Sequence, residues 1–232
     1  MAYLRSLTIK AKEPARLADF YRAVFELKTV SEEPNLIRLS DGLFTLALLK
    51  ESDEALIGIH ASGFQVESVD SVKQKTAKGG PASPHSEFQV MDPDKNLIDL
   101  SVGGFGASAE KSPFPIRHLA LFTADPRRLA DFYGAAFGLK EVGNTDRSSI
   151  FVSDGYFNQA LLYQRVGEEK NGFNHFGFKI RDVEETRDRA EKAGVRRGAA
   201  RPQRIPFAEF RLHDPEGNGI DISVKGFMPG EI

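Results

Sequence analysis

The sequence predicts an α+β fold built by tandem duplication. Residues 4–30 and 116–142 share the motif Pro-x-Arg-Leu-Ala-Asp-Phe-Tyr at a constant offset, with Pro14 matched by Pro126 and Tyr21 by Tyr133. Each stretch joins an alternating, strand-like segment to a segment of helical apolar spacing. A second strand–helix–strands pattern follows in each half. We therefore expect four similar βαβ-type modules arranged in two pairs.

The first half is predicted to contain two helices between its strands. Strands are expected at residues 4–10, 36–39, 43–49, 57–66, 87–91 and 97–102. The first helix should begin near Pro14, because a missing N–H is harmless in the first turn, and its apolar face is formed by Leu17, Phe20, Tyr21, Val24 and Phe25. A weaker helix is expected at residues 68–78, before two glycines. Ser40-Asp41-Gly42 is typical of a hairpin turn.

The second half repeats this order. Strands are predicted at residues 117–122, 149–152, 157–163, 175–180, 208–213 and 219–224, and helices at residues 126–137 and 183–193. Residues 103–115 are small, polar and proline-bearing, which is typical of a linker. We expect a first domain at residues 1–105, a linker at 106–115 and a second domain at 116–228.

Composition limits the class of partner. The formal net charge is −2, with no block of like charges, so neither nucleic acid nor an anionic membrane is an expected partner. No apolar run is long enough to span a bilayer, and the N-terminus lacks the apolar core of a signal peptide. Cysteine is absent, which excludes thiolate ligands and nucleophiles. We expect a cytoplasmic protein with a small-molecule substrate, and a homodimer is compatible with the sequence.

Three motifs in this order resemble the vicinal oxygen chelate superfamily. They are the Leu-Ala-Asp-Phe-Tyr helix, the strand His175-Phe-Gly-Phe before a Val-Glu-Glu helix, and the turn Asp214-Pro-Glu-Gly-Asn before the last strand. The superfamily includes glyoxalases, fosfomycin and bleomycin resistance proteins and extradiol dioxygenases. The resemblance covers nearly the whole chain. It implies paired βαβββ modules whose strands form two cup-shaped curled sheets, usually with a divalent metal in the cup.

The resemblance also implies a set of metal ligands in the second half, namely His118, His175 and Asp221. Two imidazoles and a carboxylate suit iron(II) or manganese, and zinc or nickel is possible. The final ligand of the superfamily is usually glutamate, whereas this chain has aspartate. The first half also has an aspartate at the matching position, Asp99. Its residues at the positions of His118 and His175 cannot bind a metal. Asp221 is therefore either a ligand or a structural residue, and the sequence leaves both open.

Further candidates lie near these positions. Residues 158–163 lack the glutamate that a glyoxalase-type lyase uses as fourth ligand and base, so that activity ranks low. Ring-cleaving dioxygenases usually have a tyrosine where this chain has Arg211, which could bind a substrate carboxylate or phenolate. Glu209 is a candidate base, and Tyr156 and Asn158 are weaker candidates for the pocket. The first half has Glu87 at the position of Glu209, so a structural role for Glu209 stays open.

Two functions follow from these residues. The first is a metal-dependent enzyme, glyoxalase-like or dioxygenase-like, acting on a small oxygenated and in some cases aromatic substrate that chelates a metal in the second half. The second is a metal-free protein of the bleomycin-resistance type, which binds a small molecule without any cofactor. The phenylalanine content is compatible with both.

Overall fold

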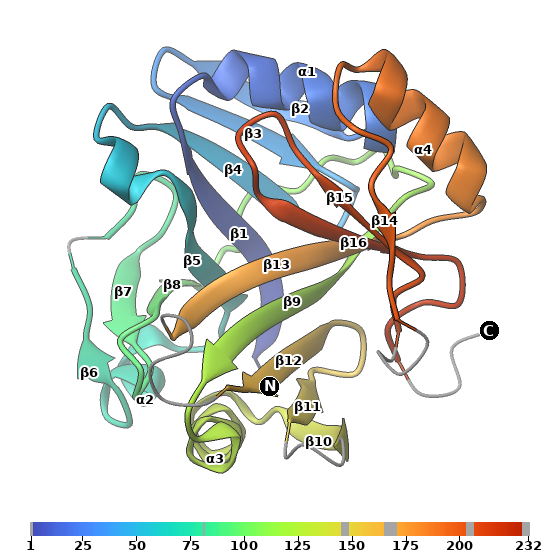
Figure 1. Cartoon of the computed structure of the whole chain (residues 1–232). Helices are drawn as coiled ribbons and strands as arrows, with labels where there is room; N and C mark the ends of the chain where they lie inside the picture. The colour runs from blue at the N-terminus through green and yellow to red at the C-terminus, as the bar shows by residue number, and fades with distance from the viewer. Residues whose placement is uncertain (1, 81, 145–148, 165–170, 203–206, 229–232) are drawn as a thin grey trace.

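The computed structural model describes residues 2–80, 82–144, 149–164, 171–202 and 207–228 (Figure 1). Elements of the first half are β1 (Tyr3–Ala11), α1 (Pro14–Phe25), β2 (Lys28–Glu33), β3 (Leu36–Ser40), β4 (Thr45–Lys50), the short 3₁₀ helix η1 (Glu54–Leu56), β5 (Gly58–Gln65), α2 (Val69–Lys73), β6 (Ala77–Lys78), β7 (Phe88–Met91) and β8 (Leu97–Ser101). The second half contributes β9 (Ile116–Thr123), α3 (Pro126–Phe137), β10 (Lys140–Asn144), β11 (Ile150–Ser153), β12 (Asn158–Tyr163), β13 (Gly172–Lys179), α4 (Val183–Lys192), β14 (Ala199–Ala200), β15 (Phe210–His213) and β16 (Gly219–Ser223).

Each half of the chain builds one eight-stranded sheet, and the strand order is the same in both. The first sheet runs β2-β3-β4-β1-β5-β8-β7-β6, and the second runs β10-β11-β12-β9-β13-β16-β15-β14. In both, the first strand pairs in parallel with the fourth and antiparallel with the fifth. The predicted fold class, an α+β tandem duplication of paired βαβββ modules, is confirmed. The proposed division into domains at residues 106–115 stays a prediction.

Both duplicated helices begin at a proline as the sequence predicts, and α3 also ends at the predicted residue. Both have proline in the first turn, and α3 is also capped by Asp125, whose side chain accepts from the N–H of Arg128 at 3.0 Å. Both end at a residue in the left-handed region, which is Gly138 in α3 but Glu26 in α1, at a φ of 52°.

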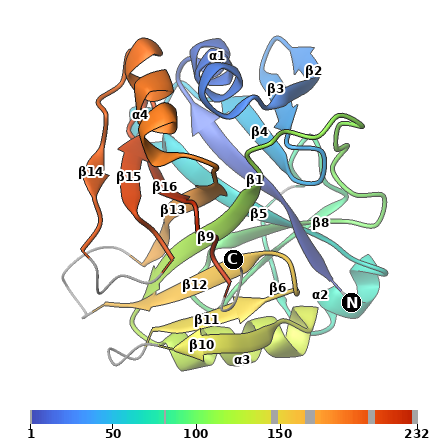
Figure 2. The ribbon, with the colours of Figure 1, turned by 90° about the vertical axis from the view of Figure 1, so that its right-hand side faces the viewer.

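The apolar faces of these helices pack across the boundary between the halves. The Phe25 ring of α1 stacks on Phe178 of β13 with centroids 3.8 Å apart, and Phe64 of β5 stacks on Phe137 of α3 at 4.2 Å. Figures 1 and 2 show the result, with α1 beside α4 at one end of the molecule and α3 at the other. Most of the buried apolar residues of both halves form one continuous core.

Hydrogen bonds also cross the boundary between the two halves, in both directions. The Tyr21 hydroxyl donates to Asp214 at 2.7 Å, and the matching Tyr133 donates to Asp92 at 3.1 Å. All four side chains are buried.

The Ser-Asp-Gly turns make a second pair of hydrogen bonds between the halves. Asp41 accepts from the N–H of Ile116 at 2.7 Å, and Asp154 accepts from the N–H of Leu4 at 3.0 Å. Each turn therefore holds the start of the other half's first strand. The contacts that each half makes with the other are therefore matched in pairs, as an approximate two-fold relation between the halves requires.

The structure differs from the prediction at the sheet edges. The strands β2 and β10 were not predicted, because they are polar edge strands without the apolar alternation that marks a buried face. The helix expected at residues 68–78 is limited to Val69–Lys73, and Val72 is the residue that it buries. Its expected last turn is instead the short strand β6, paired with β7. Among the described residues, no helix has both the length and the apolar character needed to cross a membrane.

Candidate metal centre

One row of residues crosses five neighbouring strands of the second sheet. Register places Asn158 beside His118, His118 beside Gly177, Gly177 beside Asp221, and Asp221 beside Arg211. Residues that are paired in this way point to the same face of a sheet. The polar residues predicted on separate strands are therefore brought to one face of one sheet.

The same row in the first half has a different chemistry. It reads Thr45, Ser6, Gly63, Asp99 and Gln89. The glycine and the aspartate are common to both rows. The other three positions change from hydroxyl and amide side chains to an amide, an imidazole and a guanidinium. Within these two rows, the imidazole and the guanidinium therefore occur in the second half alone.

Gly177 lies at the centre of the row. A phenyl ring covers it and leaves no room for a side chain. A Cβ on Gly177 would lie 2.6 Å from the ring of Phe227, and Gly63 has the same relation to Phe105 in the first half at 2.8 Å. The fully buried Phe227 ring also stacks on His118, with centroids 4.7 Å apart and planes at 10°. Phe227 was missed by sequence reasoning, although its match to Phe105 was a usable signal.

His118 is held in one tautomer. Its Nδ1 lies 2.9 Å from Oδ1 of Asn158, an acceptor, so Nδ1 carries the hydrogen and Nε2 keeps its lone pair. Burial, with a smaller contribution from neighbouring His175, lowers the pKa of His118 to about 3. The imidazole is therefore neutral at neutral pH, which is the form that binds metals. Asn158, a predicted pocket residue, acts here by orienting a histidine.

His175 has an acceptor at each ring nitrogen. Its Nδ1 is 2.6 Å from Oδ1 of Asn174, and its Nε2 is 3.1 Å from Oδ2 of Asp221. Burial is the main reason that the pKa of His175 is lowered. A neutral imidazole has a single N–H, so one of the two contacts lacks a proton. With the hydrogen on Nδ1, two lone pairs face each other between His175 and Asp221.

Asp221 is a buried carboxylate with a cationic partner. Arg211 donates from Nε to Oδ1 at 2.6 Å, and Nε of Arg201 lies 3.8 Å from the same oxygen. Burial by itself would raise the pKa of Asp221. The contacts with His175 and Arg211 outweigh burial and hold this pKa well below its usual range. Asp221 is therefore ionised.

Asp99, the counterpart of Asp221, is held by neutral donors. Its Oδ1 accepts from Gln89 at 3.0 Å and from the Ser86 hydroxyl at 3.1 Å, and Thr8 and His85 lie at its Oδ2. These contacts satisfy the carboxylate within the fold. An aspartate at this position can thus be purely structural, as the sequence had left open.

Other predicted residues lie further from the row. Glu209 accepts from the N–H of Val224 at 3.0 Å, and the matching Glu87 accepts from the N–H of Val102 at 2.8 Å. This shared contact favours a structural role for Glu209, and its catalytic role stays a prediction. Tyr156 lies under the guanidinium of Arg117 at 3.9 Å. Since Arg117 precedes His118 on β9, its side chain points to the opposite face.

Comparisons with known proteins agree with this architecture. Residues 118–223 match the model of the glyoxalase-like domain. The match spans the segment from His118 to the strand of Asp221, in the half that has the candidate ligands His118 and His175.

The second half of the chain is thus similar to the glyoxalase-like domain.

Solved structures show the same fold over nearly the whole chain. The Mn(II)-bound glyoxalase from Novosphingobium aromaticivorans aligns with a TM-score of 0.72 and 16% identity, covering 96% of this chain and 82% of that one. A variant of homoprotocatechuate 2,3-dioxygenase from B. fuscum, in complex with HPCA, aligns with a TM-score of 0.70 and 16% identity, covering 98% and 72%. At this identity the likeness establishes the fold alone.

A sequence relative with a named activity covers part of the chain. Metapyrocatechase 2 from Cupriavidus necator is 28% identical over 162 residues, which is 57% of this chain and 51% of that protein. The chain thus matches about half the length of this relative.

The candidate donors fit a divalent ion in type and in part by position. Two ligands at right angles, each about 2.1 Å from one ion, lie about 3.0 Å apart, and Nε2 of His175 is 3.1 Å from Oδ2 of Asp221. The His118 ring centroid is 5.3 Å from that of His175. As the side chains stand, the described residues contain no group of three or more His, Cys, Asp or Glu able to hold a metal. Binding would therefore draw the three donors closer together.

Proposed function

We propose that this chain is a metal-dependent enzyme of the dioxygenase-like or glyoxalase-like kind, with His118, His175 and Asp221 as ligands of a divalent metal. The observation that carries the proposal is the close approach of Nε2 of His175 to Oδ2 of Asp221, 3.1 Å apart in a buried site. A divalent cation bound to both would supply the positive charge that a neutral imidazole cannot. When bound, such an ion acts as a Lewis acid and holds two adjacent oxygens of a substrate.

The residues around the donors have distinct roles in this proposal. Asn158 fixes the tautomer of His118, so that Nε2 is free to bind the ion. Arg211 holds Oδ1 of Asp221, leaving Oδ2 as the ligating oxygen. Phe227 covers the buried ring of His118 and limits access of water from that side. Tyr156 stays a weaker candidate for the pocket wall.

The substrate we propose is a small oxygenated molecule, aromatic in the dioxygenase-like case. The names of metapyrocatechase and homoprotocatechuate dioxygenase support this class, and β12 has no glutamate with which to complete a lyase. The manganese of the glyoxalase neighbour supports iron(II) or manganese over zinc and nickel. A cytoplasmic location and a homodimer stay predictions.

A metal-free binding protein is the second candidate, and one contact favours it. Arg211 already neutralises Asp221, and this charge competes with a metal for the carboxylate. In that case neutral His175 would carry its hydrogen on Nε2 and donate it to Oδ2 of Asp221. The cup would then bind its ligand through contacts with side chains alone.

Metal analysis of protein purified without a histidine tag separates the two candidates. We expect close to one equivalent of iron or manganese in the parent, lost in His175→Ala and retained in Ser6→Ala. Oxygen consumption with catechol as the probe, measured on the iron-loaded protein, tests the dioxygenase-like reaction. A parent protein that takes up none of iron, manganese, zinc or nickel would contradict the metal proposal.

A further inference from the structure

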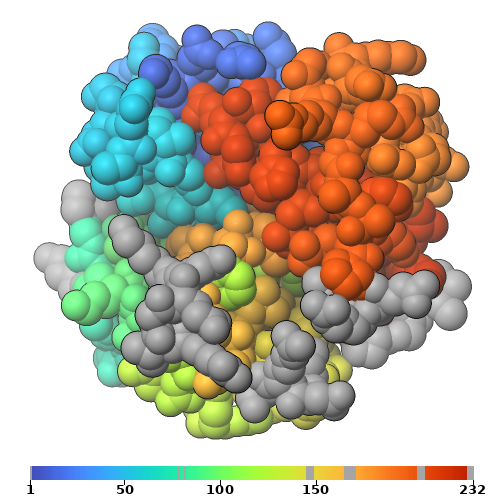
Figure 3. Space-filling model, in the orientation of Figure 1, coloured from blue at the N-terminus to red at the C-terminus, as the bar shows by residue number. Residues whose placement is uncertain are grey.

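A groove bordered by arginines lies next to the proposed centre. Its walls come from the start of α1, the loop after α4 and the strand β15, and its volume is about 780 Å³. Figure 3 shows this face, where the start of the chain in blue borders the orange and red C-terminal segments. A cavity of this size accommodates a small organic molecule.

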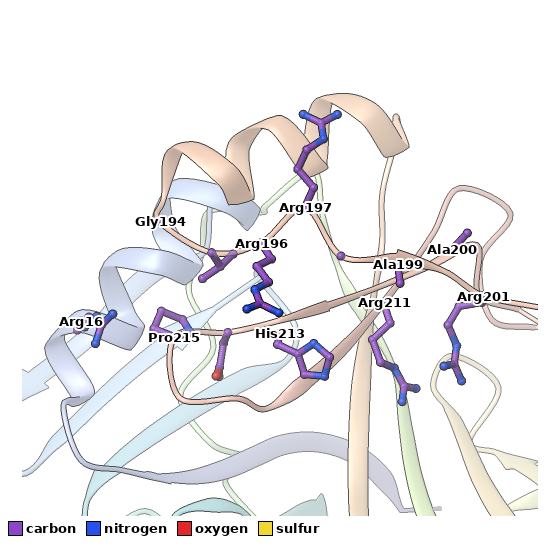
Figure 4. A pocket seen from close by; sticks show the side chains of 13 residues that line it. Arg16, Gly194, Arg196, Arg197, Ala199, Ala200, Arg201, Arg211, His213 and Pro215 are labelled. Carbon is purple, nitrogen blue, oxygen red and sulfur yellow. The ribbon is translucent and has the colours of Figure 1, made fainter.

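The groove is linked to the metal donors through two arginines. Arg211 and Arg201 both line it, and both approach Oδ1 of Asp221, whose other oxygen faces His175. In Figure 4 the side chains of Arg201, Arg211 and His213 extend to the same side of β14 and β15. A molecule in the groove can therefore contact both arginines and remain close to the donors.

These two guanidinium groups have donors that the protein leaves unused. Nε of Arg201 and Nη2 of Arg211 are buried, and neither has a hydrogen-bond partner among the described residues. A buried charged donor without an acceptor is costly, so such groups are normally paired with a ligand or water. Arg196 also lines the groove, and in the described part of the chain no carboxylate pairs with it. Together these side chains present more positive charge than Asp221 can neutralise.

A fourth arginine of the groove differs in this respect. Arg197 is paired with Glu184, Asp188 and Glu191 of α4, and Figure 4 shows its side chain directed away from Arg211. Its charge is thus taken up by the protein, which makes it a matched control.

The loop that supports the groove has a fixed shape. Gly198 has a φ of 77°, and a Cβ there would lie 2.2 Å from the carbonyl oxygen of Arg211. This position therefore requires glycine, because any side chain would force the loop off β15. The first half has Gln89 and Met91 at the positions of Arg211 and His213, so these two basic residues have no basic counterpart in the first half.

We propose that this groove binds the anionic group, a carboxylate or a phosphate, of a small organic molecule, with Arg201 and Arg211 as its main contacts and Arg196 at the rim. The planar guanidinium groups offer paired N–H donors that match the oxygens of such an anion. The statement that this molecule is the substrate rests on the function proposed above. The anion is held at one end, and its remaining part reaches toward His175 and Asp221.

Binding of simple anions to metal-free protein tests the groove independently of catalysis. The protein is passed over a chelating resin and titrated calorimetrically with benzoate and with inorganic phosphate at constant salt. We expect saturable binding of at least one of these probes by the parent. Affinity should fall at least about tenfold in Arg201→Gln, since an interaction with a charged group is lost. It should fall less in Arg196→Gln and stay within about twofold in Arg197→Gln.

Two results would overturn the proposal. One is a parent protein that binds neither probe. The other is an equal loss in Arg197→Gln and Arg201→Gln, which would indicate general surface charge. Metal content of the same proteins is measured separately. Anion binding without metal uptake would leave the groove standing and remove the metal-dependent function, whereas metal uptake without anion binding would do the reverse.

Discussion

Arg211 donates to Oδ1 of Asp221 across 2.6 Å at the register position where Gln89 donates to Asp99 across 3.0 Å in the first half. Both aspartates are buried and occupy the same place in their sheets. One is paired with a cation and a histidine, and the other with neutral donors. The duplicated fold thus provides an internal control for the function of its second half.

Replacing each aspartate by asparagine should have unequal effects. Asp221→Asn leaves the Arg211 charge unpaired, and we expect a loss of about 3 kcal/mol in the free energy of unfolding together with loss of metal. Asp99→Asn removes a carboxylate from neutral donors and should cost about 1 kcal/mol with metal content unchanged. Urea unfolding and metal titration of both variants check this. Equal behaviour of the two would exclude Asp221 as a ligand.

Arg211→Gln reproduces the pairing of the first half at the metal centre. Removing the guanidinium frees Oδ1 of Asp221 and removes a competing charge, so affinity for manganese should rise. Competition titration with a fluorescent chelator measures this change. Gln89→Ala, which alters the equivalent residue of the first half, is the control and should leave manganese affinity unchanged. Weaker manganese binding in Arg211→Gln would show that the arginine supports the ligand.

Stability should fall as the pH is lowered below about 6.5. The pKa of His118 is about 3 in the folded protein and about 6.5 when unfolded, so between these values the unfolded chain binds a proton that the folded chain does not. The contribution of His118 at pH 5 is on the order of 2 kcal/mol relative to pH 7. Urea unfolding of the parent and of His118→Gln at both pH values gives the difference. The loss on acidification should be smaller in the variant, and equal losses would contradict a neutral, buried His118.

The duplicated tyrosines should contribute about equally to stability. Tyr21→Phe and Tyr133→Phe each leave a buried aspartate without its hydroxyl donor, and each should cost about 1–3 kcal/mol. The two sites are well separated, so the double variant should show the sum of the two losses. Thermal unfolding measures all three proteins. A loss of stability in only one of the two variants would show that only one of these hydrogen bonds between the halves stabilises the fold.

His118→Ala and Ser6→Ala change matched positions and should separate the halves functionally. We expect His118→Ala to abolish activity and metal binding if the protein is a metalloenzyme, and Ser6→Ala to leave both nearly intact. Circular dichroism of both variants shows whether the fold is kept. Retained metal binding in His118→Ala would exclude this histidine as a required ligand.

Much of the fold was determined by local patterns in the sequence. The helix Pro126–Phe137 was predicted to the residue, because it repeats the motif of the first helix, which begins at a proline. The repeated motif predicted two equivalent halves, and equal strand order confirms them. His118, His175 and Asp221 were named as candidates from motifs alone. These features depend on neighbours within a few residues, so the sequence could specify them.

The arrangement of the site was decided by tertiary structure alone. The contact of Arg211 with Asp221 depends on strand register, the cover that Phe227 provides depends on a residue beyond the last strand, and the approach of Arg201 depends on the loop after α4. The hydrogen bond from Tyr21 to Asp214 joins residues from opposite halves. Such contacts arise from how two curved sheets are paired and packed, and no local period in the chain records that geometry.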